Sequence, residues 1–196
     1  MADAALDSTS ITAAILAGGA GSRLGGRDKG LEPLAGKPLI AHVLDAMRGQ
    51  TGTQLICANR NAEVYAQFAP VLADAASGFH GPLAGISAAL AACKTDWLLT
   101  VPVDCPRPPL DLAARLRIHV GDARAAVAQV DGAEPLFALY RRELAAVAAE
   151  ALARNAAVWR WQEDIGAIAV DFADRRGHFV NLNTIVDFRA WERAHG

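Results

Sequence analysis

The chain has 196 residues, of which 53% are hydrophobic and 20% charged, and its net charge is -2. This composition supplies enough apolar material for a buried core and excludes a largely disordered chain. The slightly acidic balance excludes bulk binding of nucleic acid or a membrane surface through excess positive charge. The three cysteines are widely spaced and form no CxxC pair, which argues against a disulfide framework or a zinc site and predicts a reducing, cytoplasmic location.

Short apolar runs alternate with helical patterns along the chain. We expect residues 1–10 to be a flexible leader and residues 11–196 to be a single domain. In chain order, strands are predicted at 11–17, 53–58, 70–74, 97–101, 124–130, 135–140 and 166–170, with helices beginning after Pro38 and near residues 61, 86, 109, 141, 158 and 185. Strands that are apolar on both faces and alternate with helices indicate a three-layer α/β/α sandwich with a Rossmann-like, mostly parallel sheet.

A long glycine-rich loop, LAGGAGSRLGGRDKG (16–30), follows the first predicted strand. Its glycines let backbone N–H groups approach an anion closely, and Arg23 and Lys29 add positive charge. No GK[ST] motif follows, and Leu24 stands where a GxGxxG motif needs its third glycine. The loop therefore predicts a polyphosphate site unlike that of a P-loop hydrolase or a dinucleotide-dependent dehydrogenase.

Ligands of such sheets bind beyond the carboxyl ends of the strands, where the glycine-rich loop and Asp104 are predicted to lie. Asp104 in VPVDCP follows an apolar strand, and its carboxylate suits Mg²⁺, which takes one or two protein carboxylates plus phosphate oxygens and water. Asn181 and Asn183 in FVNLNT alternate with a leucine, so in an extended segment both amides face one side. The alternative readings are a turn cap for Asp104 and loop caps for the asparagines.

The motif LAGGxGSRLGGxDKG resembles the signature of the MobA-type guanylyltransferases, which make the guanine dinucleotide form of the molybdenum cofactor. Later pieces match in the same order, namely ANR at 58–60, GPLAGI at 81–86, VPVDCP at 101–106 and FVNLNT at 179–184. The resemblance covers the chain from residue 11 onward. It implies the nucleotide-diphospho-sugar transferase fold. It also implies transfer of GMP from GTP to molybdopterin-bound molybdenum, with release of pyrophosphate.

The resemblance also implies roles for single residues. The GTP-binding residues it implies are Leu16, Ala17, Gly18, Gly19, Lys29, Asp74 and Asp104. It implies Arg23, Lys29 and Asp104 as catalytic, Asp104 as the ligand of Mg²⁺ or Mn²⁺, and Asn181 and Asn183 on the pterin side. Transient contact with molybdoenzyme apoproteins or their chaperones follows from the need to pass on the product. For Asp74 we hypothesise that the carboxylate accepts hydrogen bonds from the two adjacent donors of guanine, the alternative being a helix or turn cap.

The sequence departs from the resemblance at two places. Cys57 stands where many relatives have the first Asn of NANR, and Ala156 and Ala157 stand where relatives often have basic residues. These departures leave open how this chain holds the base and the pterin. The alternative functions are a CTP-using cytidylyltransferase of the same cofactor, another small-substrate or sugar-phosphate nucleotidyltransferase, and a non-catalytic nucleotide-binding adaptor.

Overall fold

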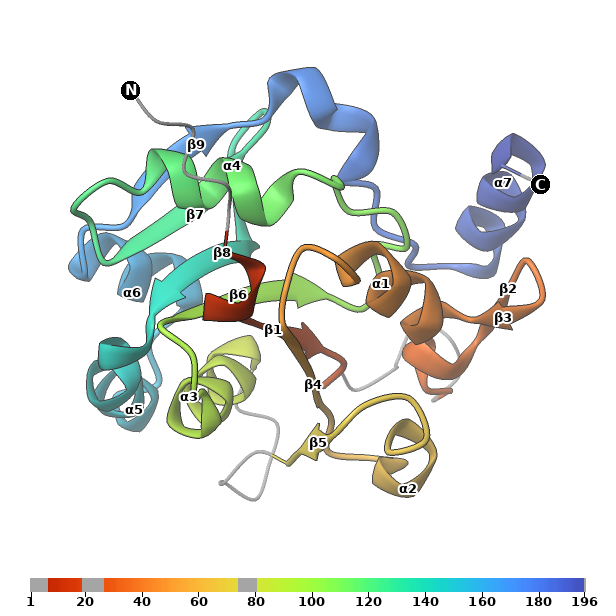
Figure 1. The fold of residues 1–196 in the computed structure, drawn as a ribbon. Coiled ribbons are helices and arrows are strands. Elements are labelled where there is room, and N and C mark those ends of the chain that lie inside the picture. The colour runs from red at the N-terminus through yellow and green to blue at the C-terminus, as the bar shows by residue number, and fades with distance from the viewer. Residues whose placement is uncertain (1–6, 19–26, 74–80, 196) are drawn as a thin grey trace.

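The computed structural model describes residues 7–18, 27–73 and 81–195 (Figure 1). One sheet has the strand order β5-β4-β1-β6-β8-β7-β9. Its strands are β1 (Ile11–Leu16), β4 (Thr53–Cys57), β5 (Val71–Leu72), β6 (Trp97–Pro102), β7 (Ala125–Gln129), β8 (Ala133–Arg141) and β9 (Ile168–Asp171). Neighbouring strands are parallel except where β8 pairs with β6 and β7. The prediction of a mostly parallel sheet is confirmed, and each predicted strand corresponds to one of these strands.

Helices cover both faces of the sheet and complete three layers (Figure 1). The helices are α1 (Leu39–Met47), α2 (Ala62–Tyr65), α3 (Pro82–Ala92), α4 (Leu112–His119), α5 (Ala145–Ala153), α6 (Val158–Asp164) and α7 (Ile185–His195). α1 and α4 pack on the face to which Ala13 and Ile15 of β1 point, whereas α3, α5 and α6 pack on the face of Ala14. Successive side chains of a strand point to opposite faces, so β1, which is apolar apart from Thr12, contributes to both cores.

The helix α3 begins at Pro82 rather than near residue 86 as predicted. Gly81, with φ of 70°, precedes it, and Pro82 occupies the first helical position. Proline is tolerated there because the first N–H groups of a helix have no partner within the helix. Residues 82–85 of the GPLAGI motif therefore form the first turn of α3, ahead of the predicted start.

The chain joins the folded body just before β1. Residues 8–10 form a short 3-10 helix, and the carbonyl of Ser8 accepts a hydrogen bond from the backbone N–H of Gly52 at 2.6 Å. Most of the predicted leader, residues 1–6, lies outside the described residues, so its flexibility stays a prediction. Among the described helices, none combines the length and hydrophobicity needed to cross a membrane.

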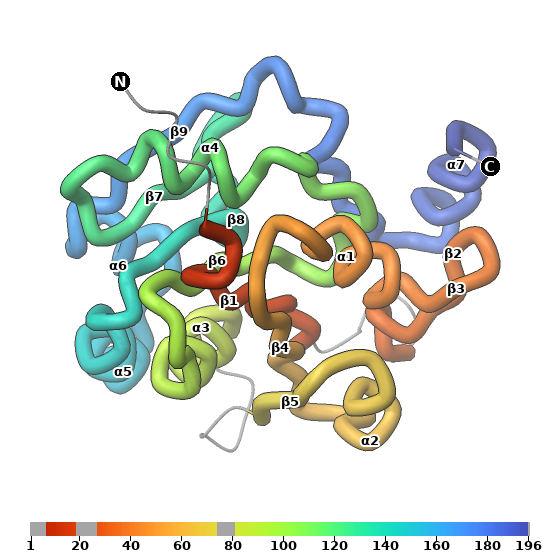
Figure 2. The backbone as a smooth tube through the Cα atoms, viewed as in Figure 1, coloured from red at the N-terminus to blue at the C-terminus, as the bar shows by residue number. Residues whose placement is uncertain are grey.

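A small unit stands at the edge of the three layers. β2 (Pro33–Leu34) and β3 (Lys37–Pro38) form an antiparallel hairpin, and α7 lies beside this hairpin in both the ribbon and the tube views (Figures 1 and 2). The backbone N–H of Ala35 donates a hydrogen bond to Glu192 Oε1 at 2.9 Å. An apolar cluster separate from the two main cores joins the hairpin to α7, and it consists of Leu34, Leu39, Leu182 and Phe188, with Trp191 packed against it.

Candidate active site

Three neighbouring parallel strands end at one edge of the sheet. Leu16, the last residue of β1, pairs with Cys57 of β4 on one side and with Pro102 of β6 on the other. Beyond the strands, Ala17 N donates a hydrogen bond to the carbonyl of Cys57 at 2.9 Å, and Val103 N donates to the carbonyl of Leu16 at 3.1 Å. These hydrogen bonds fix the start of the glycine-rich loop beside the loop that carries Asp104.

Lys29, Asp104 and Asn183 meet at this edge. The ammonium group of Lys29 donates hydrogen bonds to Asp104 Oδ2 at 3.1 Å and to Asn183 Oδ1 at 2.8 Å. The Lys29 and Asp104 side chains are each 23% exposed, so the ion pair is partly shielded but open to a ligand. A further hydrogen bond, from Leu182 N to the carbonyl of Asp104 at 2.8 Å, joins the loop after β6 to the segment before α7. The structure thus brings together residues that are up to 154 positions apart in the chain.

The turn of residues 28–30 (the 28–30 turn) places Lys29 in this cluster. Asp28 precedes a 3-10 helix over Lys29–Leu31, and its Oδ1 accepts a hydrogen bond from Gly30 N at 3.3 Å. The same oxygen accepts from the Tyr65 hydroxyl of α2 at 2.5 Å, and Oδ2 accepts from Asn61 Nδ2 at 2.9 Å. Lys29 was predicted from the sequence as a site residue, whereas Asp28, Asn61 and Tyr65 were not.

The segment of residues 181–187 (the 181–187 segment) places Asn183 from the other side. Asp187 Oδ2 accepts hydrogen bonds from the backbone N–H groups of Asn183 at 2.8 Å and Thr184 at 2.7 Å. In return, Asp187 N donates to Thr184 Oγ1 at 3.3 Å, which completes a reciprocal cap at the start of α7. The two backbone hydrogen bonds lower the pKa of Asp187 and keep it charged. The T-x-x-D pattern at 184–187 is the sequence signal that could have identified this cap.

The other residues that the sequence pointed to lie in several places. Leu16, Ala17 and Gly18 lie at the described start of the loop, whereas Gly19, Arg23 and Asp74 lie outside the described residues. Cys57 is buried, and its thiol donates a hydrogen bond to the carbonyl of Gly85 at 3.5 Å, so the position that departs from the resemblance contacts α3. Ala156 and Ala157 directly precede α6.

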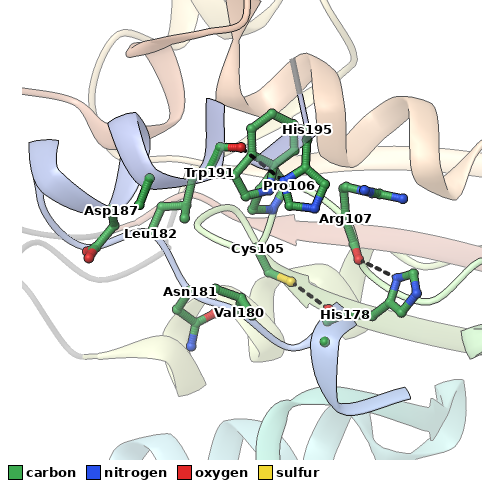
Figure 3. Close-up of a pocket in the computed structure, with 12 residues that line it drawn as sticks. Cys105, Pro106, Arg107, His178, Val180, Asn181, Leu182, Asp187, Trp191 and His195 are labelled. Carbon is green, nitrogen blue, oxygen red and sulfur yellow. Dashed lines mark hydrogen bonds between the residues drawn. The ribbon is translucent and has the colours of Figure 1, made fainter. Parts of the chain in front are cut away.

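A pocket of about 410 Å³ lies between α7, the turn at 105–107 and the segment at 177–182 (Figure 3). Asn181 and Trp191 are among the residues that line it. Two hydrogen bonds fix the wall opposite α7, from Cys105 Sγ to the carbonyl of His178 at 3.1 Å and from His178 Nδ1 to the carbonyl of Arg107 at 3.1 Å. Burial raises the pKa of Cys105 to about 12, so its thiol is a neutral donor and not a nucleophile. Asn181 thus borders this pocket, while Asn183 contacts Lys29.

The fold and this edge cluster can be compared with known proteins. Residues 13–176 match the family model described as a MobA-like NTP transferase domain. The chain belongs to the MobA-like NTP transferase family. Membership makes it a nucleotidyltransferase and confirms the family resemblance drawn from the glycine-rich loop and the later motifs.

Two curated relatives extend over nearly the whole chain. The molybdenum cofactor guanylyltransferase of Mannheimia succiniciproducens is 40% identical over 185 residues, which cover 92% of this family member and 97% of the relative. The molybdenum cofactor guanylyltransferase of Yersinia pseudotuberculosis is 42% identical over 186 residues, which cover 93% and 95% of the two chains.

Solved structures confirm the expected fold class. The molybdopterin-guanine dinucleotide biosynthesis protein A of Archaeoglobus fulgidus superimposes on this family member with a TM-score of 0.78 at 23% identity, covering 93% and 97% of the two chains. The 2-C-methyl-D-erythritol 4-phosphate cytidylyltransferase of Thermus thermophilus gives a TM-score of 0.69 at 15% identity, covering 92% and 96%. The chain therefore has the nucleotide-diphospho-sugar transferase type of α/β/α fold.

Proposed function

We propose that this chain transfers GMP from GTP to molybdopterin-bound molybdenum, forming the guanine dinucleotide cofactor and pyrophosphate. Two relatives that align over nearly the whole chain are named molybdenum cofactor guanylyltransferases, which supports this function. The observation that carries the site assignment is the meeting of Lys29, Asp104 and Asn183 at the carboxyl edge of the sheet.

The reaction is a phosphoryl transfer with an anionic nucleophile. An oxygen of the terminal phosphate of the pterin forms a bond to the α-phosphorus of GTP. The bond from that phosphorus to the oxygen bridging to the β-phosphorus breaks, and pyrophosphate leaves with the electron pair. Because the attacking phosphate is already ionised, no general base is needed, and catalysis depends on alignment and charge neutralisation.

We assign roles to the side chains on this basis. Lys29 stabilises the negative charge that develops on the departing pyrophosphate, together with Arg23 of the glycine-rich loop. The backbone N–H groups of the glycine-rich loop beyond Ala17 bind the rest of the triphosphate, and Asp74 accepts hydrogen bonds from guanine. The acceptor lies on the side of Asn181 and Asn183. The partial exposure of Lys29 and its distance of 2.8 Å from Asn183 Oδ1 support the roles given to these two residues.

The donor set at Asp104 fits a divalent cation that binds together with a nucleotide. Asp104 offers a partly exposed carboxylate, which is a hard oxygen ligand. The amide oxygen of Asn183 lies nearby, because it accepts a hydrogen bond from the same Lys29 ammonium group as Asp104 does. Among the described residues, no cluster of three or more His, Cys, Asp or Glu side chains could hold a metal ion. Mg²⁺ takes few protein ligands and completes its shell with phosphates and water, so Asp104 would hold Mg²⁺, or Mn²⁺, on the triphosphate. When bound, the cation would neutralise phosphate charge.

Two features of the cellular setting belong to the same proposal. All three cysteines lie within the described residues and none of them forms a disulfide, which supports a reducing, cytoplasmic location. Transfer of the product requires transient contact with molybdoenzyme apoproteins or with their chaperones.

Single substitutions test the site assignment. We expect Lys29→Ala and Asp104→Ala each to lower kcat by about 10²–10³, the usual loss when one preorganised electrostatic group is removed. Pyrophosphate release with GTP and the pterin acceptor is the measurement. Lys37→Ala is the matched control: Lys37 pairs with Asp45 of α1 and not with the site, so we expect this variant to keep normal turnover. Wild-type turnover in Lys29→Ala or Asp104→Ala would refute the assignment.

Thermal shifts with Mg²⁺ and single nucleotides test the choice of donor. A ligand at a hundred times its Kd stabilises the protein by about 2.7 kcal/mol. We expect a rise in Tm with GTP and none with CTP, UTP, ATP or NAD. A shift with CTP alone would make the chain the cytidylyl relative, and GTP binding without pyrophosphate release would make it an adaptor.

A further inference from the structure

The carboxylate of Asp28 is held by a hydroxyl group from the protein core. Tyr65 is fully buried on α2, in the same apolar cluster as the helix α1 and the strand β1. Its hydroxyl group and the amide of Asn61 approach the two different oxygens of Asp28. Burial raises the pKa of Tyr65, and the hydrogen bond to Asp28 raises it further, so the hydroxyl stays protonated and remains a donor.

The residue that follows Lys29 is fixed by the same tyrosine. A Cβ atom added at Gly30 would lie 2.3 Å from the Tyr65 hydroxyl oxygen and 3.0 Å from Val103 Cγ2. The backbone at Gly30 therefore fits closely between Tyr65 and Val103, the residue before Asp104. Lys29 lies between Asp28 and Gly30, the two residues that Tyr65 contacts. Gly30 also packs against Val103, so the backbone at Lys29 is fixed relative to the loop that carries Asp104.

We propose that the Tyr65 hydroxyl, acting through Asp28, is a positioning group that sets where the ammonium group of Lys29 can reach. This role rests on the proposed function, in which Lys29 acts on the phosphates. A lysine side chain has a flexible stem of four carbons, so the positions that its ammonium group can occupy are limited only if its backbone is fixed. A displacement of about 1 Å at a reacting group can cost about a hundredfold in rate. Loss of this one hydroxyl group lowers kcat by about tenfold.

A second buried tyrosine in the chain offers a matched control. Tyr140 of β8 is also fully buried, and its hydroxyl oxygen lies 2.6 Å from Gln162 Nε2, within the other apolar cluster. Tyr65→Phe and Tyr140→Phe each remove one buried, hydrogen-bonded hydroxyl group and keep the ring. We expect both variants to lower Tm by a similar amount. Only Tyr65→Phe lowers kcat, and the KM for GTP changes by less than about twofold.

A double-mutant cycle separates positioning from general loosening of the fold. In a Lys29→Met background, which is assayed by single-turnover pyrophosphate release, Tyr65→Phe causes no further loss of rate. A second tenfold loss in that background, an equal loss of kcat in Tyr140→Phe, or wild-type kcat in Tyr65→Phe would overturn the inference. If Lys29→Met itself turns over normally, the role of Lys29 under the proposed function fails instead, so the two failures are distinct.

Discussion

The 28–30 turn and the 181–187 segment deliver their side chains to the same place by different means. Lys29 is delivered by a turn whose carboxylate, Asp28, is bound to the buried hydroxyl group of Tyr65. Asn183 is delivered by a segment whose support is the cap formed by Thr184 and Asp187 at the start of α7. The position of the Lys29 ammonium group therefore depends on the main core. The position of the amide depends on a cap near the surface and on the small cluster that joins α7 to the β2–β3 hairpin.

The largest effect is expected from a substitution in the 28–30 turn, which the main core supports. Gly30→Ala places a methyl group against the Tyr65 hydroxyl and Val103, and we expect it to lower the free energy of unfolding by about 1–3 kcal/mol, as overpacking does. Urea unfolding gives this quantity. The variant should also lose turnover, since Tyr65 must shift away from Asp28.

Gly132→Ala is the control for this substitution, because a Cβ atom there meets no described atom within 4 Å. We expect it to leave stability and turnover within the error of the measurement. Adding Tyr65→Phe to Gly30→Ala removes the clashing oxygen, so the double variant should be less destabilised than the sum of the two single variants. Strict additivity would contradict the steric explanation.

A smaller effect is expected on the α7-supported side. Asn183→Ala removes one hydrogen bond to the ammonium group of Lys29, and we expect kcat to fall by about tenfold with little change in Tm. Steady-state pyrophosphate release alongside a melting curve measures both. A loss as large as that of Lys29→Ala would mean that Asn183 and Lys29 act as one unit, and the contrast between the two supports would disappear.

The smallest effect is a pH dependence of the contact between α7 and the body. His42 Nε2 donates a hydrogen bond to the carbonyl of Leu34 at 2.7 Å, and its ring meets the Trp191 ring edge-on at 5.6 Å. Burial lowers the pKa of His42 below 6.5, and Lys37 lowers it further, while the hydrogen bond to Leu34 and the charge of Asp45 raise it. The unfolded chain therefore binds this proton more readily than the folded chain.

The stability that His42 contributes is complete above about pH 6.5 and is lost as the pH falls towards the folded-state pKa. We expect Tm to fall more for the wild-type chain than for His42→Gln between pH 7.5 and 5.5. The two proteins differ only at residue 42, so the difference between the two curves isolates His42. Parallel curves would contradict this prediction, because they would show that the pKa of His42 is the same in the folded and the unfolded chain.

Much of the sheet could be predicted from the sequence because its strands are short and apolar on both faces. The runs that form β1 and β6 are buried almost throughout, and each ends directly before a polar or glycine-rich loop. The loop with Lys29 and the loop with Asp104 were each predicted to follow the carboxyl end of a strand, and the carboxyl ends of parallel strands share one edge of the sheet. In the structure, Lys29 and Asp104 meet at this edge through a hydrogen bond.

The supports of the site could not be predicted in the same way. The contact between Asp28 and Tyr65 joins residues 37 positions apart, and neither a periodic pattern nor a motif links a loop carboxylate to a tyrosine in a four-residue helix. The start of α3 was predicted too late, because glycines such as Gly81 and Gly85 are typical of turns. In the structure, Gly85 lies buried within the helix. Such features depend on tertiary packing, which overrides local preference.

The attachment of α7 has a consequence for how the molecule opens. A helix that is fastened by a cluster of a few apolar side chains separates from the body at a lower free energy than the strands of a doubly covered sheet. We therefore expect amide hydrogens in α7 to exchange with solvent through local unfolding, and those of β1 and β6 to exchange only when the whole domain unfolds. We expect each local opening to withdraw Asn183 while Lys29 stays in place, so that the folded protein would briefly hold only two of the three side chains of the site together.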